Sequence, residues 1–204
     1  MHPNPAFRKT PDDQNLAFAR DRAFGILAVN GEAGPQISHV PFLLSDDGQS
    51  ADLHLVRSNP IVRTISAPTS AVIAISGPDG YVSPDWYGIE DQVPTWNYVA
   101  VHLRGTLNRL PTEDMHDMLD RQSAAYEDRL LPKPPWRTGK MDQEALRKML
   151  RMIVPFRMEI QSVDGTWKLN QNKPDDVRMR AADAIESGGI GSELSALVAM
   201  MRDA

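Results

Sequence analysis

The sequence predicts an α+β fold that is mainly β: an antiparallel barrel of about six main strands with helices outside it. Short apolar runs separated by Gly-, Pro-, Asn- and Asp-rich turns recur at regular spacing as far as Gly105. One of these runs, residues 95–105, is long and rich in aromatic and β-branched residues, as strands are. From Pro111 onward, apolar residues recur instead at helical spacing.

The first part of the chain predicts one helix followed by strands. Thr10 is a suitable cap, Pro11 suits the first helical position, and Asp12 and Asp13 suit the positive end of the helix dipole. A short helix is predicted after Ser58-Asn59-Pro60, through about residue 65. Strands are predicted at residues 24–29, 36–44, 52–57, 70–76 and 81–83, with turns at 30–34, 46–48 and 77–80.

The long strand from residue 95 has two different faces, because successive side chains alternate in a strand. Val99, Val101 and Leu103 share one face and predict packing on a core. Thr95 and Asn97 continue that face with hydrogen-bonding groups, which indicates a strand leading from a core toward a site.

The remaining elements predict a helical insert and C-terminal helices within a single domain of residues 1–204. The insert covers about residues 112–152, with a break at 131–136, and the C-terminal helices cover about 174–202. Between them, a strand is predicted at 156–163, a hairpin turn at Asp164-Gly165 and a partner strand at 166–169.

Composition narrows the class of protein. The chain has 204 residues, a net charge of −5 and no cysteine, so disulfides and thiolate chemistry are excluded. An acidic balance argues against a surface that binds nucleic acid throughout. No apolar run is long enough for a membrane span, and the first residues lack the apolar core of a signal peptide, so we expect a cytoplasmic protein.

Several segments together resemble the PaiB family, FMN-binding negative transcriptional regulators with an FMN-binding split β-barrel. The resemblance is carried by VPTWNYVAVHLRG at residues 93–105, YVSPDWY at 81–87, HVPF at 39–42, LHLVRSNP at 53–60, IVPF at 153–156 and WKLNQNK at 167–173. It implies FMN as cofactor, a homodimer and a role in transcription, with DNA as a partner by resemblance only.

The first candidate group is His54, Arg57, Ser58 and Asn59, where a strand enters a capped helix. A helix N-terminus offers free N–H groups, and Arg57 adds a cation suited to a phosphate. The resemblance to FMN-binding split barrels implies that this strand end would hold the flavin phosphate. A capped helix after an exposed arginine would give the same pattern.

The second candidate group is Thr95, Trp96 and Asn97, with Trp86 and Tyr87 in the preceding loop. Thr and Asn side chains can bond the pyrimidine edge of a flavin, and a Trp can form its apolar wall. Core or dimer-interface packing is an equally good explanation for the tryptophans.

The third candidate group is Trp167, Lys168, Gln171, Asn172 and Lys173, just before Pro174. The lysines could meet a phosphate, and the amides could bond the ring or the ribityl chain; a solvated connection would look similar. In the WKLNQNK run, Asn170 stands where the family usually has Ser.

No residue stands out as catalytic, and the histidines show no metal-ligand spacing. Two other functions stay open: a flavin-dependent oxidoreductase related to pyridoxamine-phosphate oxidases, or a heme-binding split-barrel protein. A small barrel filled by its own side chains leaves no interior room for a cofactor, so we expect the flavin in an outer groove completed by a second subunit.

Overall fold

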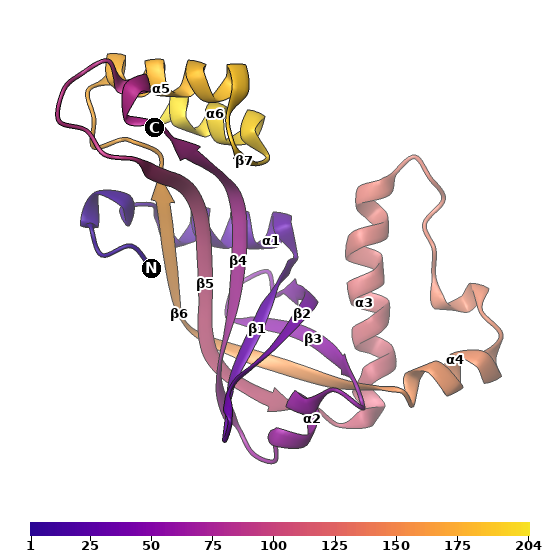
Figure 1. Ribbon diagram of the computed structural model, residues 1–204. Helices are drawn as coiled ribbons and strands as arrows, with labels where there is room; N and C mark the ends of the chain where they lie inside the picture. Colours follow the sequence, from indigo (N-terminus) through magenta and orange to yellow (C-terminus); the bar gives the residue numbers. More distant parts are fainter. The chain divides into compact units, whose positions relative to one another are not determined.

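The computed structural model describes all residues, 1–204, as two compact units (Figure 1). Unit 1 consists of Met1–Phe18, Ile75–His102 and Asp164–Ala204, and unit 2 consists of Ala19–Ala74 and Leu103–Val163. Each unit is described separately below. The assignment of the whole chain to a single domain stays a prediction.

The strands form one antiparallel sheet in the order β1-β2-β3-β6-β5-β4-β7. β1 also pairs with β4, so the six strands β1, β2, β3, β6, β5 and β4 form a closed ring, as the predicted barrel requires. The strands are β1 Phe24–Gly31, β2 Gly34–Leu44, β3 Ser50–Val56, β4 Thr69–Val82, β5 Thr95–Arg109, β6 Ile153–Lys168 and β7 Gly191–Ser192.

Two predicted turns are wrong, because β4 and β6 continue through them. Glycines suggested turns at residues 77–80 and at Asp164-Gly165. In the structure these glycines lie inside strands where neighbouring atoms come close. A Cβ on Gly77 would lie 2.6 Å from the Phe18 ring, and one on Gly165 would lie 2.1 Å from Asn15 Oδ1. These glycines therefore permit close packing, which is the other common use of glycine within a strand.

Unit 2 contains the paired strands β1, β2 and β3 and the helices of the insert. The helices of the insert are α3 Met115–Glu127 and α4 Gln143–Leu150, and unit 2 also contains α2 Pro60–Thr64, between β3 and β4. The predicted helix at residues 112–127 begins with a 3₁₀ turn, Thr112–Asp114. Tyr126 fixes α3 to the sheet, since its hydroxyl donates to the Phe42 carbonyl over 2.8 Å. Met115 and Met118 of α3 are buried, as their helical spacing predicts.

Gly105 has a specific role between β5 and β6, which are neighbours in the sheet. A Cβ at this position would lie 1.8 Å from the carbonyl oxygen of Glu159. The strand does not end there but continues to Arg109. Only glycine permits so close an approach of the two backbones.

Unit 1 contains the outer part of β5 and the C-terminal helices α5 Asp175–Gly188 and α6 Leu194–Asp203, which pack side by side (Figure 1). The α1 helix, Asp12–Arg22, begins one residue after the predicted first position, Pro11, with Asp12 and Asp13 in its first turn as expected. The two faces of β5 differ as expected: Asn97 and Val99 are buried, whereas Trp96 is exposed. The unit has its own core, which includes Val82, Tyr87, Trp167, Leu169, Val177, Ala181, Ile185, Leu197, Val198 and Met201.

Candidate functional site

The structure brings together three members of the predicted groups around one ammonium group in unit 1. Lys168, at the end of β6, donates from Nζ to the Thr95 hydroxyl and, over 2.8 Å, to the Trp96 carbonyl. The ring of Phe7 lies 5.9 Å from the same nitrogen. We call Thr95, Trp96 and Lys168 the Lys168 cluster.

Burial lowers the pKa of Lys168, because a half-buried ammonium loses hydration that neutral oxygens replace only in part. Its protein partners are a hydroxyl, a carbonyl and an aromatic ring, all uncharged. None of the contacts of the Lys168 ammonium is a carboxylate. An anion bound beside it would therefore meet a cation whose charge is not already paired. Such a cation gains more from a phosphate than a fully solvated lysine does.

An aromatic surface lies on the other face of β5, where the side chain of Trp96, a residue that is 42% exposed, projects away from the side of Thr95. The Trp96 Nε1 group donates to Asp79 Oδ1 over 2.9 Å, which fixes the indole orientation. Tyr81 packs edge-on against both Trp96 and Trp86, with ring centroids 6.2 Å apart in each pair. Tyr81, Trp86 and Trp96 form what we call the aromatic surface, which offers a wall for a flat ring.

Asn97 does not lie on this surface, because it is fully buried. Its Nδ2 group contacts the Met201 sulfur at 3.5 Å, and its Oδ1 atom has no hydrogen-bond partner. A role for Asn97 in binding stays a prediction, and its burial gives it a structural position between β5 and α6.

The predicted polar group at residues 171–173 forms a turn after β6. Gln171 bonds the backbone of this turn, accepting from Leu169 N over 2.8 Å and donating to the Trp167 carbonyl. Lys173 donates to the Gln92 side chain, and its Nζ lies 4.8 Å from the centre of the Tyr87 ring. Asn172 is exposed.

Asn170, which stands where the family usually has Ser, suits the conformation of this turn. Its φ of 64° is left-handed, a conformation that asparagine tolerates better than most residues. Its Oδ1 atom also accepts from the buried hydroxyl of Tyr87 at 3.3 Å. Asparagine therefore meets both requirements of this position: the backbone conformation and the buried acceptor.

A cleft of about 480 Å³ lies in unit 1 and is lined in part by Leu169 and Gln171, at the start of the same turn. Gln171 belongs to it, whereas most of its other lining residues were not predicted as site residues. Trp167 lines it and donates from Nε1 to Asn15 Oδ1 over 2.9 Å. The lining residues are Ala6, Lys9, Thr10, Gln14, Trp167, Leu169, Gln171, Met200, Asp203 and Ala204. Their scattered sequence positions gave no local signal.

The first predicted group lies in unit 2, and its side chains contact the protein itself. Arg57 donates to the carbonyls of Arg151, at 2.9 Å, and Ile153, at 3.3 Å. Asn59 caps α2, accepting from Ile61 N over 3.0 Å and donating to Ser38 Oγ over 3.1 Å. The predicted cap is confirmed, while a phosphate role for Arg57, Ser58 and Asn59 stays a prediction.

His54 is a partly buried histidine on β3. Burial lowers its pKa, and a hydrogen bond with Gln122 acts in the opposite direction. The Nδ1 atom has no hydrogen-bond partner. The imidazole is therefore mainly neutral at neutral pH.

No group of three or more His, Asp or Glu side chains in the structure could hold a metal ion. None of the helices combines the length and the apolar character that a membrane span needs.

The residues of unit 1 fit the chemistry of a flavin. A flavin presents a flat aromatic ring, a hydrogen-bonding pyrimidine edge and, in FMN, a phosphate. The aromatic surface can face a flat ring, and Lys168, together with the Thr95 hydroxyl bonded to it, can meet a phosphate.

Comparisons with known proteins agree with this fit. Residues 1–162 match a family model described as "Putative FMN-binding domain". The chain is 27% identical to the Bacillus subtilis protein "Protease synthase and sporulation protein PAI 2", over 89% of this chain and 87% of that protein. It is also 25% identical to the uncharacterized protein AFUA_5G13800 of Aspergillus fumigatus, over 76% of this chain and 78% of that one.

Solved structures confirm the fold. The FAD and heme binding protein from Mycobacterium smegmatis superposes with a TM-score of 0.61 at 17% identity, covering 91% of this chain and 82% of that chain. The flavocytochrome Anf3 from Azotobacter vinelandii gives a TM-score of 0.55 at 13% identity, covering 76% and 67%. The fold is a flavin-binding split barrel, and the family match supports a flavin cofactor. The chain belongs to the PaiB family of FMN-binding split-barrel proteins.

Proposed function

We propose that this protein binds FMN and acts as a negative transcriptional regulator of the PaiB type. The observation that carries the flavin proposal is the Lys168 cluster beside the aromatic surface. The cluster supplies a half-buried cation and a hydroxyl, and the next side chain along β5 supplies an exposed indole on the other face of the strand. The regulatory role rests on family membership, because no side-chain arrangement described above reads DNA bases.

In this proposal, each residue has a task. Lys168 binds the phosphate, Thr95 holds the Lys168 ammonium in place beside it, and Trp96 offers an exposed aromatic face. An FMN bound there would supply oxidation–reduction chemistry, and the protein's own residues bind it, orient it and exclude water from one side. Gln171, Asn172 and Lys173 border the cluster along the chain and complete the polar rim.

The protein acts as a homodimer in this proposal. Unit 1 exposes large apolar side chains that a second subunit would cover, with Val93 73% and Ile190 66% exposed, besides Trp96. A twofold dimer would give two equivalent sites. Light scattering tests this: a dimer that the Trp96→Lys substitution converts to monomer supports the interface, and a wild-type monomer that binds FMN refutes it.

Ligand selectivity tests the cofactor. We expect the fluorescence of FMN to fall when FMN is titrated with the purified protein. FMN should bind roughly tenfold or more tightly than riboflavin, because riboflavin has no phosphate for Lys168 to bind. Tighter binding of FAD would point to a different flavin. A Soret band with hemin, without any flavin binding, would favour the heme alternative over the proposal.

The regulatory part requires its own experiment. A labelled duplex from the region upstream of the protein's own gene should bind the FMN-loaded protein, with an affinity that falls as salt rises. Equal affinity for an unrelated duplex would contradict specific regulation. NAD(P)H consumption by the FMN-loaded protein in the absence of DNA binding would instead favour the oxidoreductase alternative.

A further inference from the structure

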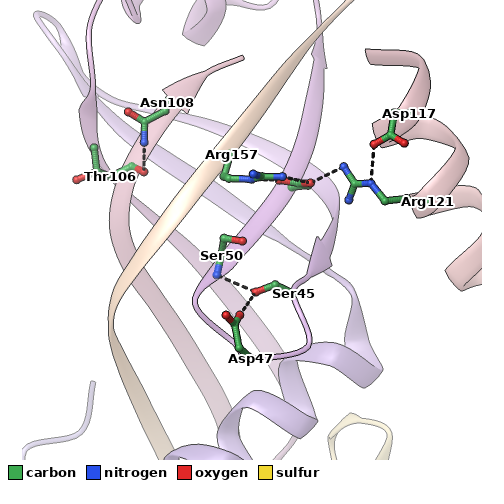
Figure 2. Close-up of polar contacts among 9 residues, drawn as sticks. Ser45, Asp47, Ser50, Thr106, Asn108, Asp117, Arg121 and Arg157 are labelled. Atoms are coloured by element: carbon green, nitrogen blue, oxygen red, sulfur yellow. Dashed lines mark hydrogen bonds and ion pairs between the residues drawn. The ribbon is translucent and has the colours of Figure 1, made fainter. Parts of the chain in front are cut away.

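A separate cluster of charged side chains lies in unit 2, where two arginines from different elements contact the same buried carboxylate. Asp52 of β3 accepts from Arg157 of β6 at both oxygens, over 2.7 and 2.9 Å. Arg121 of α3 reaches the same carboxylate at 3.0 Å. Figure 2 shows the side chains of Arg157 and Arg121 pointing toward each other, with Asp117 beside Arg121; both arginines contact Asp52. We call Asp52, Arg121 and Arg157 the Asp52 cluster.

The two half-exposed guanidiniums of the Asp52 cluster share one buried carboxylate. The Asp52 side chain is only 5% exposed, while the two guanidiniums are 43% and 42% exposed. One buried carboxylate therefore offsets one of two arginine charges. Asp117 pairs with Arg121 at 2.8 Å, but it is 75% exposed, so solvent screens this pair. Asp114 and Glu159 also act on Arg157, and Asp46 lies on the cavity wall, so the two guanidiniums offer oriented donors rather than a surplus of positive charge.

The guanidiniums also keep unused hydrogen-bond donors. Each carries five N–H groups. Arg157 uses its Nε and Nη2 groups toward Asp52, and Arg121 uses Nε toward Asp117 and Nη2 toward Asp52. The Nη1 group of each arginine has no partner within the protein. Because Asp52 fixes both planes, these donors are oriented before any ligand arrives.

Both arginines line a cavity of about 350 Å³. Its walls are part polar and part apolar: Leu43, Leu44, Ser45, Asp46, Ser50, Asp52, Arg121, Ala125 and Arg157. The Ser45 hydroxyl is already committed, donating to Asp47 over 2.7 Å and accepting from Ser50 N over 3.0 Å (Figure 2). A ligand here would have an anionic end for the guanidiniums and a short apolar body for Leu43, Leu44 and Ala125.

We propose that this cavity binds a small organic monocarboxylate through Arg121 and Arg157. A carboxylate matches the planar fork of a guanidinium, which bonds it in two parallel contacts. A ligand with a single negative charge meets less repulsion from Asp46 and Asp117 than a dianion does. A phosphate dianion fits less well, because the exposed Asp46 carboxylate lies on the cavity wall. The volume is at the lower end for small-molecule pockets, which suits a body of a few carbon atoms. The site is independent of the proposed flavin function.

Calorimetric titration of the full-length protein with butyrate tests the proposal, at constant ionic strength because chloride also competes for arginine. Butyramide has the same shape without the charge, and inorganic phosphate has charge without the apolar body. We expect saturable heat with butyrate, none with butyramide and weaker binding of phosphate. Equal binding of butyrate and butyramide, or preferential binding of phosphate, would overturn the proposal.

Variants locate the site. Arg121→Gln leaves the bidentate Asp52–Arg157 pair intact and should weaken butyrate binding roughly tenfold or more. Arg121→Lys keeps the charge but loses the fork and should also weaken it, which keeps the test available if the first variant does not fold. The matched control is Arg129→Gln, another half-exposed arginine, which pairs with Asp21. Unchanged butyrate affinity in both Arg121 variants, or an equal loss in the control, would refute the site.

Discussion

Substituting Gly105 by alanine tests the closest backbone approach in the barrel. The added Cβ would lie 1.8 Å from Glu159 O, 2.8 Å from Glu159 C and 3.1 Å from Ile160 Cα. Favourable contacts between heavy atoms need about 3.5–4.0 Å, so β5 and β6 would have to separate by more than roughly 1 Å. All three atoms belong to the backbone, so no side-chain rotation can relieve the clash.

The cost follows from this geometry. Overpacking costs about 1–3 kcal/mol where side chains can adjust. Here two paired strands must move and weaken their hydrogen bonds, each worth about 1 kcal/mol. We therefore expect a loss of roughly 3 kcal/mol or more in the free energy of unfolding. For a chain of this length, that loss lowers the melting temperature by about 6–12 °C.

Urea and thermal unfolding monitored by circular dichroism measure this loss. The control is Gly139→Ala, because a Cβ at Gly139 meets no atom within 4 Å. That variant should be neutral or more stable by up to about 1 kcal/mol. If the Gly105 and Gly139 variants unfold at the same temperature, the close approach of β5 and β6 is refuted.

Two further predictions concern buried polar contacts. Burial alone would raise the pKa of Asp52, but hydrogen bonds and charges of Arg157 and Arg121 outweigh it and hold the pKa below its usual value. The resulting stability is present above the unfolded pKa of about 3.9 and is lost as the pH falls below it. Unfolding should therefore show Asp52→Asn less stable by about 1.5–3 kcal/mol at pH 7, with a gap that narrows below about pH 4; a gap independent of pH would contradict the ion pairs. Trp167→Phe should cost about 1–3 kcal/mol in urea unfolding, because Asn15 Oδ1 would lose its buried donor; equal stability would show that this hydrogen bond is not formed.

Strand alternation and helix caps predicted much of this fold. The buried face of β5 and the start of α1 followed from residue type and spacing alone. The glycines at 77 and 165 were misinterpreted because a turn and a close approach use the same residue. Only the atoms across the gap, Phe18 and Asn15, distinguish the two uses, and they lie far away in the sequence.

The candidate site was predictable only in part, for a similar reason. Proximity to a strand end suggested Thr95, Trp96 and Lys168, and the structure brings these three residues into contact, while their role in binding stays a prediction. Arg57 has a side chain that suits a phosphate ligand, yet its guanidinium donates to the carbonyls of residues 151 and 153. The Asp52 cluster was missed, since its members lie on three separate elements and none carries a local pattern.

The most direct test of the flavin proposal is the FMN affinity of a Lys168→Met variant, which keeps the length of the side chain and removes its charge. Lys148→Met is the matched control, because Lys148 is exposed on α4. We expect the Lys168 variant to bind FMN roughly tenfold or more weakly in a fluorescence titration, with riboflavin affected much less. The control should bind as the wild type does. An unchanged preference for FMN over riboflavin in the Lys168 variant would contradict the assignment of the phosphate to this cluster.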